Sequence, residues 1–133
     1  MRRVLVDTNV IVSALLSPDG AAGRALLRVT ANDELVLTPW IEDELRDVID
    51  RKWPQRRGAL DSYLRSLDYT LVRAEESGVV IRDPDDQPIL DAAITNMVDI
   101  IVTGDMDFHT LALDLPKVMT PREFLDSDTE NDG

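Results

Sequence analysis

Residues 4–12 read Val-Leu-Val-Asp-Thr-Asn-Val-Ile-Val, and this stretch decides the fold class of the chain. Its first three residues form a short, wholly apolar run, which is typical of a strand buried on both faces of a parallel sheet. The run stops at Asp7, and a segment with helical character follows from Asn9 to Leu16. Because ligands of open α/β sheets bind outside the carboxyl ends of the strands, Asp7 is expected at the floor of a site. An Asp at this position is also typical of a simple helix cap. The presence or absence of other acids at the same edge decides between a site and a cap.

The composition fits one soluble globular domain. The 133 residues include 44 % apolar side chains, enough for a sizeable core, and no cysteine, which excludes disulfides and thiolate metal ligands. The first apolar run ends early, and no stretch approaches the roughly 20 apolar residues of a membrane helix. We therefore expect no signal peptide, no membrane partner and a cytoplasmic location. We expect a folded domain over residues 1–125 and an acidic, disordered tail over residues 126–133.

Strand and helix patterns alternate along the chain, which predicts an α/β fold with a central parallel sheet covered by helices on both faces. Apolar runs predict strands at Val4–Val6, Glu34–Leu37, Tyr69–Val72, Val79–Ile81, Ile100–Val102 and Lys117–Met119. Helical spacing and capping residues predict helices near Asn9–Leu16, Ala21–Ala31, Pro39–Trp53, Arg57–Asp68, Gln87–Met97, Phe108–Leu113 and Pro121–Leu125.

Further acids are expected at the edge where Asp7 lies. Asp105 comes just after the apolar strand Ile100–Val102, much as Asp7 follows the first strand, and Asp107 is two residues further on. Glu44 borders the apolar face of the third predicted helix, which makes it the better candidate there for an inward carboxylate, although a Glu at such a boundary is more often solvated. Two buried parallel strands that both end in Asp are expected to be neighbours, which favours a site over simple capping.

A fourth acid comes from the start of the helix near Gln87, where Asp83, Asp85, Asp86 and Asp91 crowd together. Asp86 shares the inward face with Ile89, three residues later. Asp91 lies five residues beyond Asp86, so the two point about 140° apart and do not easily line one pocket. We choose Asp86, with Asp85 as the alternative and Asp83 as a loop residue.

Four converging carboxylates repel one another unless a cation lies between them. Mg²⁺ and Mn²⁺ prefer oxygen ligands, activate water near neutral pH and stabilise the oxygens of a phosphodiester. Thr8 and Thr103 follow the two strands and would position a water or substrate from the same edge. Hydroxyls that satisfy nearby backbone groups are an equally good interpretation of these two residues.

The net charge of −12 argues against a nucleic-acid partner, although its distribution matters more than its sum. Four of the acids lie in the expected tail, and without them the charge is −8. A basic segment surrounds Trp53 and is either a solvated helix end or a patch that steers phosphates. Its members are Arg46, Arg51, Lys52, Arg56 and Arg57.

Together these motifs resemble a PIN domain, most closely the VapC-like toxin ribonucleases of toxin–antitoxin pairs. The resemblance covers Val4 to about Leu125. It implies a three-layer α/β/α fold and Mg²⁺- or Mn²⁺-dependent endoribonuclease activity, and we expect an RNA substrate, an antitoxin partner and a homodimer. It assigns catalysis and metal binding to Asp7, Glu44, Asp86 and Asp105, with Asp107 as an accessory ligand. The motifs are Val-Asp-Thr-Asn at residues 6–9, Glu-Leu at 44–45, Asp-Pro-Asp-Asp at 83–86 and Val-Thr-Gly-Asp at 102–105.

Other classes of protein fit less well. A receiver domain needs paired acids after its first strand, and a haloacid-dehalogenase-like phosphatase needs Asp-x-Asp, whereas Asp7 is followed by Thr8 and Asn9. A non-catalytic PIN-fold binding module remains an alternative that a test for metal-dependent nuclease activity would separate. Trp40 and Trp53 are interpreted as packing residues, and His109 as a surface or helix-end residue.

Overall fold

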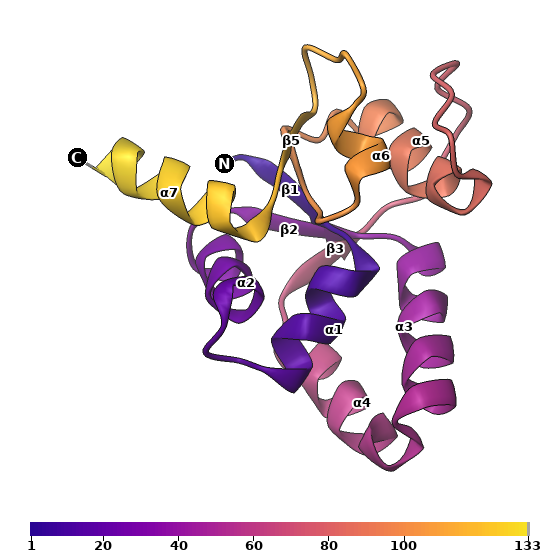
Figure 1. Cartoon of the computed structure of the whole chain (residues 1–133), viewed down its shortest axis with the longest axis vertical. Helices are drawn as coiled ribbons and strands as arrows, with labels where there is room; N and C mark the ends of the chain where they lie inside the picture. Colours follow the sequence, from indigo (N-terminus) through magenta and orange to yellow (C-terminus); the bar gives the residue numbers. More distant parts are fainter. Residues whose placement is uncertain (133) are drawn as a thin grey trace.

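The computed structural model describes residues 1–132, and their side chains as far as Ser127. It shows a five-stranded, wholly parallel sheet, and Gly133 lies outside the described residues (Figure 1). The order across the sheet is β3-β2-β1-β4-β5, so the first strand is central. The strands are β1 (Arg3–Val6), β2 (Glu34–Leu37), β3 (Tyr69–Leu71), β4 (Ile100–Val102) and β5 (Lys117–Met119).

Helices cover both faces of the sheet, which confirms the predicted three-layer α/β/α architecture. The chain moves from β1 to β3 in one direction and from β4 to β5 in the other, and right-handed crossovers of opposite direction place their helices on opposite faces. One face carries α1 (Thr8–Leu16), α2 (Ala21–Asn32), α3 (Pro39–Lys52) and α4 (Arg57–Ser66), and the other carries α5 (Gln87–Thr95) and α6 (Met106–His109) (Figure 1). The chain also forms two 3-10 turns, η1 (Pro54–Arg56) and η2 (Pro84–Asp86), and a last helix, α7 (Pro121–Asp132), packed against α2.

No single helix within residues 1–132 is long and apolar enough to span a membrane. Helices α1 and α2 reach the length and composition of a span only when they are taken together, and a bend of 108° separates them.

The boundary between β1 and β4 is the point where the direction of strand order reverses. Val4, Leu5 and Val6 of β1 lie opposite Ile100, Ile101 and Val102 of β4, and all six side chains are buried. The backbone N–H of Asp7 extends this pairing by donating to the carbonyl of Val102 at 3.0 Å. Such a reversal leaves a crevice at the carboxyl ends of the two strands, where α/β proteins place their ligands.

Local capping explains why α3 begins where the sequence predicts. Thr38 is the N-cap, and its hydroxyl accepts a hydrogen bond from the backbone N–H of Ile41 at 3.1 Å. Pro39 occupies the first helical position, where no backbone N–H is required. The buried side chains of Ile41, Leu45 and Ile49 then hold one face of the helix against the core.

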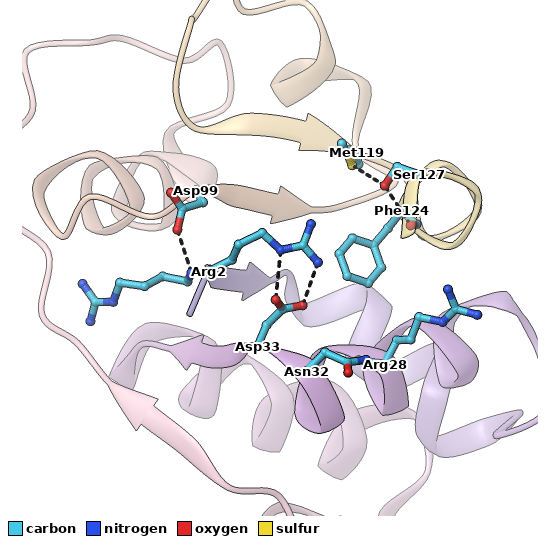
Figure 2. Close-up of polar contacts among 9 residues, drawn as sticks. Arg2, Arg28, Asn32, Asp33, Asp99, Met119, Phe124 and Ser127 are labelled. Atoms are coloured by element: carbon cyan, nitrogen blue, oxygen red, sulfur yellow. Dashed lines mark hydrogen bonds and ion pairs between the residues drawn. The ribbon is translucent and has the colours of Figure 1, made fainter. Parts of the chain in front are cut away.

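The carboxyl-terminal helix α7 runs from Pro121 to Asp132, and the disordered tail expected from residue 126 stays a prediction. Its start is a reciprocal cap: the Thr120 N–H donates to the Glu123 carboxylate at 3.0 Å, and the Glu123 N–H donates to the Thr120 hydroxyl at 3.1 Å. Phe124 of this helix is fully buried. Ser127 donates a hydrogen bond to the carbonyl of Phe124 at 3.0 Å (Figure 2).

A bidentate ion pair lies at the amino ends of β1 and β2, beside this helix. The Arg2 guanidinium contacts both carboxylate oxygens of Asp33, at 2.9 and 3.0 Å, and lies 5.7 Å from the centre of the Phe124 ring (Figure 2). Asp33 is buried, so a charged partner is needed to offset its lost hydration.

The strand predicted at Val79–Ile81 is not present, and this prediction is wrong. The side chain of Gln87 takes the place of a neighbouring strand: its amide donates to the Val79 carbonyl at 2.7 Å, and its oxygen accepts from the Ile81 N–H at 3.1 Å. The same amide donates to Asp91, which also accepts hydrogen bonds from Ser77. The backbone of residues 79–81 therefore pairs with no strand, although the apolar side chains alternate.

Replacing Gln87 by Ala should destabilise the protein by about 1–3 kcal/mol, because it leaves partly buried backbone groups of residues 79–81 without partners. Urea unfolding would measure the difference. The control is Gln55→Ala, a change at an exposed position in η1 that should stay within about 0.5 kcal/mol of the unmodified protein. Equal effects of the two substitutions would contradict this account of the segment.

Candidate functional site

Asp7 lies at the carboxyl end of β1, and both oxygens of its buried carboxylate are engaged. Oδ1 accepts a hydrogen bond from the Thr8 N–H at 2.7 Å, so Asp7 is the N-cap of α1. Oδ2 accepts a hydrogen bond from the Thr103 hydroxyl at 2.8 Å, across the boundary between β1 and β4. Asp7 can therefore cap α1 and at the same time belong to a cluster of acids at this edge.

Glu44 projects from α3 toward the same edge. Its Oε1 accepts a hydrogen bond from the hydroxyl of Thr8, the first residue of α1, at 2.8 Å. The side chain of Trp40, one turn earlier on α3, lies near enough to the Glu44 carboxylate to interact with it. The Thr8 hydroxyl thus holds Glu44 at the start of α1, beside the first turn of its own helix.

Asp105 follows β4 and caps α6 by accepting a hydrogen bond from the Asp107 N–H at 2.9 Å. This cap starts the helix at Met106, two residues before the predicted start at Phe108. The Thr103 hydroxyl is fully buried: it accepts from the Asp105 N–H at 3.0 Å and donates to Asp7. One hydroxyl therefore links the ends of β1 and β4.

A second group of carboxylates lies beside this link. Oxygens of Asp83, Asp86 and Asp107 all lie within 4.8 Å of one another. The Oδ2 atom of Asp86 is buried and has no hydrogen-bond partner among residues 1–132. Asp107 forms an ion pair with the exposed Arg82, at 3.3 Å.

Sequence reasoning left Asp83 in a loop, whereas the structure brings it into this group. The local signal was present, because a residue before proline favours an extended backbone and Asp is a preferred cap. Asp83 is the N-cap of η2 and accepts a hydrogen bond from the Asp85 N–H at 3.0 Å. Asp91 is turned to Ser77 and Gln87, as described above.

Burial and mutual repulsion raise the pKa values of the acids at this edge. The pKa of Asp86 rises from 3.8 to about 7, first through burial, then through the hydrogen bond and charge of Asp105 and the charges of Asp7 and Asp83. Burial raises the pKa of Asp7 more than its hydrogen bonds from Thr103 and Thr8 lower it. These effects reflect the close approach of acids from separate elements.

Glu44 belongs to the same electrostatic network. Burial raises its pKa most, a hydrogen bond from Thr8 opposes the shift, and the charges of Asp7 and Asp85 add to it. The alternative acid Asp85 therefore lies near Glu44, while Asp86 lies near Asp105.

The basic residues lie further along α3 and beyond it, and the structure separates them. Arg57 is committed to ion pairs with Asp50 and Asp61. Lys52 lies over the ring of Trp53, 5.9 Å from its centre, and Arg56 is exposed. Arg51 alone of the four predicted substrate-binding cations lines the hollow that contains Glu44.

Two neighbouring hollows share Trp40 as a wall. The first, of about 420 Å³, contains Glu44, Asp85 and Arg51, and the second, of about 370 Å³, lies on the side of Arg73. The interpretation of Trp40 as a packing residue does not describe its position, because 39 % of the residue is exposed.

Comparison with known proteins shows which family this chain belongs to. Residues 3–107 match the family model described as PIN domain. The chain belongs to the PIN-domain family. Uncharacterized protein MJ1680 of Methanocaldococcus jannaschii is 28 % identical, and the match covers 93 % of this chain and 90 % of that protein.

Two crystal structures show the same PIN fold at low sequence identity. VapBC2 from Rickettsia felis, bound to a DNA fragment from its promoter, has a chain that matches with a TM-score of 0.65 and 19 % identity, over 88 % of this chain and 96 % of that one. DNA-bound VapBC from Salmonella typhimurium matches with a TM-score of 0.68 and 14 % identity, over 91 % and 99 % of the two chains.

The raised pKa of Asp86 predicts a pH-dependent stability for the metal-free PIN domain. The folded protein holds this proton more tightly than the unfolded chain, so the stabilisation is complete below about pH 4 and is lost as the pH rises toward 7. In Asp86→Asn the part of this loss that comes from Asp86 should disappear, so the pH dependence should be weaker and the variant more stable than the unmodified protein at pH 8. Urea unfolding in EDTA at pH 5 and pH 8 measures it. The control is Asp114→Asn, at an exposed loop position, which should keep the original pH dependence; the same dependence in Asp86→Asn would contradict the assignment.

Proposed function

We propose that this PIN-domain protein is a Mg²⁺- or Mn²⁺-dependent endoribonuclease that hydrolyses RNA phosphodiester bonds. The observation that carries the proposal is the buried, partnerless Oδ2 of Asp86 inside a cluster of acids at the strand-order reversal. A carboxylate oxygen without a donor in such a place is an expected ligand of a hard cation.

The residues present fit such a cation. Mg²⁺ holds its ligands at about 2.1 Å, so two of them lie at most about 4.2 Å apart. The oxygens of Asp83, Asp86 and Asp107 are within 4.8 Å of one another and need only a small approach. All are hard oxygen donors, and the like charges that raise the pKa of Asp86 are those that a divalent cation would offset.

We assign the metal ligands to the acids of this edge. They are Asp7, Glu44, Asp86 and Asp105, with Asp107 as the accessory ligand and Asp83 as an addition from the structure. A bound ion would activate water and stabilise the developing charge on the phosphodiester oxygens.

The chain's own residues orient this site. Thr103 holds the Asp7 carboxylate from one side and Thr8 holds Glu44 from the other, so neither acid is free to rotate. In the metal-free state near neutral pH, Asp86 carries a proton for part of the time, which limits the repulsion within the cluster. Arg51 lies beside Glu44, where a cation would meet the phosphate backbone of RNA.

The similar solved structures suggest the biological setting. Both are VapBC assemblies bound to DNA. By this likeness we propose that the chain is the toxin of a toxin–antitoxin pair, with an antitoxin protein as partner and a homodimer as the assembled unit. Copurification with the product of an adjacent small gene would test the partner.

Replacing Asp7 by Asn should reduce Mn²⁺-stimulated RNA cleavage by at least about 100-fold, because the variant removes a charged oxygen from the centre of the cluster. Asn retains the cap of α1, so the circular dichroism spectrum should not change. Gel assays of a labelled single-stranded RNA, with and without Mn²⁺, measure the loss. The control is Asp68→Asn, an exposed acid after α4, which should cleave normally. Undiminished cleavage by Asp7→Asn would overturn the metal-site assignment.

The basic segment should contribute to RNA affinity through its unpaired members. The triple replacement of Arg51, Lys52 and Arg56 by Ala should weaken binding and lower the slope of log affinity against log salt by about 2, since each lost phosphate contact removes about 0.7. Arg57 is left intact because it is paired with Asp50. The control of equal charge replaces Arg24, Lys117 and Arg122, all exposed elsewhere. Equal slopes for the two triple variants would indicate that the basic segment is a solvated surface without phosphate contacts.

A further inference from the structure

The side chain of Trp40 lies near Glu44 while part of its surface stays open. It interacts with the Glu44 carboxylate, which belongs to the proposed catalytic cluster. The residue nevertheless remains 39 % exposed and forms a wall of two hollows. A packing residue would bury its ring, whereas the position of Trp40 near Glu44 leaves an aromatic surface open beside the cluster.

The second hollow has the chemistry of a nucleotide-binding surface. It holds about 370 Å³, and one charged residue, Arg73, stands among largely flat apolar groups. The hydroxyl of Thr38 is already committed to capping α3. Thr38, Pro39, Trp40, Arg73, Ala74 and Pro88 line it. We call it the Trp40–Arg73 hollow.

The backbone at Arg73 is held in place although it lies outside any strand. The preceding Val72 donates its N–H to the Leu37 carbonyl at 2.9 Å, which extends the pairing of β3 with β2. The Asn96 side chain donates to the Arg73 carbonyl at 2.8 Å. The Arg73 side chain is exposed, and no ion pair among the described residues occupies it. Its charge is thus available to a ligand.

We propose that the Trp40–Arg73 hollow binds one nucleotide of single-stranded RNA next to the cleaved phosphodiester, with its base stacked on Trp40 and its phosphate at Arg73. This subsite rests on the proposed ribonuclease function and adds to it a named aromatic contact. Base stacking tolerates any sequence, because every base has a π face.

Charge separates the roles of the two hollows. The first contains Asp43, Glu44, Asp47 and Asp85 against Arg51 alone, so without a cation it repels phosphate. The Trp40–Arg73 hollow carries a positive charge and no carboxylate. Stacking also depends little on net charge. It therefore supplies affinity for RNA that electrostatic attraction does not give to a protein with a formal charge of −12.

The test measures binding rather than cleavage. In a Trp53→Phe background Trp40 is the only tryptophan, and its fluorescence reports directly on a stacked base. A five-nucleotide oligouridylate with a fluorescent label is titrated with Ca²⁺ in place of Mg²⁺, to follow binding without turnover. The anisotropy of the label measures the affinity of every variant, including those that lack Trp40. We expect quenching of Trp40, a loss of affinity of roughly tenfold or more in Trp40→Leu, and a much smaller loss in Trp40→Phe.

Trp40→Phe is the matched control for the interaction with Glu44, because it keeps an aromatic face and loses the indole N–H. If Trp40→Phe binds as weakly as Trp40→Leu, Trp40 acts only through Glu44 and the subsite is wrong. An oligonucleotide with one abasic position adds a second test. Loss of the stacked base should weaken binding to the unmodified protein, and that loss should vanish in Trp40→Leu; equal losses in both proteins would overturn the proposal.

Arg73 is tested by the salt dependence of the same titration. Arg73→Ala should lower the slope by about 0.7, the value of one phosphate contact on a single strand, and Arg65→Ala, an exposed arginine on α4, should leave it unchanged. Quenching without any metal-dependent cleavage would remove the nuclease proposal and leave a binding site for single strands. Cleavage with an affinity independent of Trp40 would remove the subsite alone.

Discussion

The buried hydroxyl of Thr103 is the contact on which the arrangement of this edge depends. It accepts from the Asp105 backbone and donates to the Asp7 carboxylate, so it joins the ends of β1 and β4 at the place where strand order reverses. Val4–Val6 and Ile100–Val102, which lead up to this point, are apolar and buried, and a buried polar group at their ends needs a partner. The hydroxyl satisfies the two sides at once and keeps Asp7 and Asp105 in register.

Gathering acids around this contact has an electrostatic cost that the fold meets in two ways. Hydrogen bonds from Thr8, Thr103 and backbone N–H groups stabilise the ionised forms of Asp7 and Glu44. Asp86, whose Oδ2 lacks such a donor, has its pKa raised to about 7. Arg82, which is exposed and pairs with Asp107, is the one cation that the described residues bring to this group. The edge therefore favours further positive charge, which is the physical basis for the proposed metal site.

The sequence by itself determined the features that depend on local pattern. Apolar runs of three or four residues located all five strands of the sheet, and the acids that follow two of them located Asp7 and Asp105 at one edge. Capping residues such as Thr38 defined helix starts, because a cap is a contact over three residues. The ordered motifs alone indicated the PIN family, which the family model confirms.

Tertiary structure decided whatever depends on a partner far along the chain or across the fold. Val79–Ile81 has the pattern of a strand, but a strand requires a neighbour, and the Gln87 side chain satisfies its backbone instead. Asp83 and Asp107 are 24 positions apart, and only the tertiary fold brings their oxygens together. The same holds for Arg57, which looks like a free cation in the sequence and is paired with Asp50 and Asp61 in the fold. Spacing along a chain defines which face a side chain occupies, whereas its partner is defined only when the elements pack.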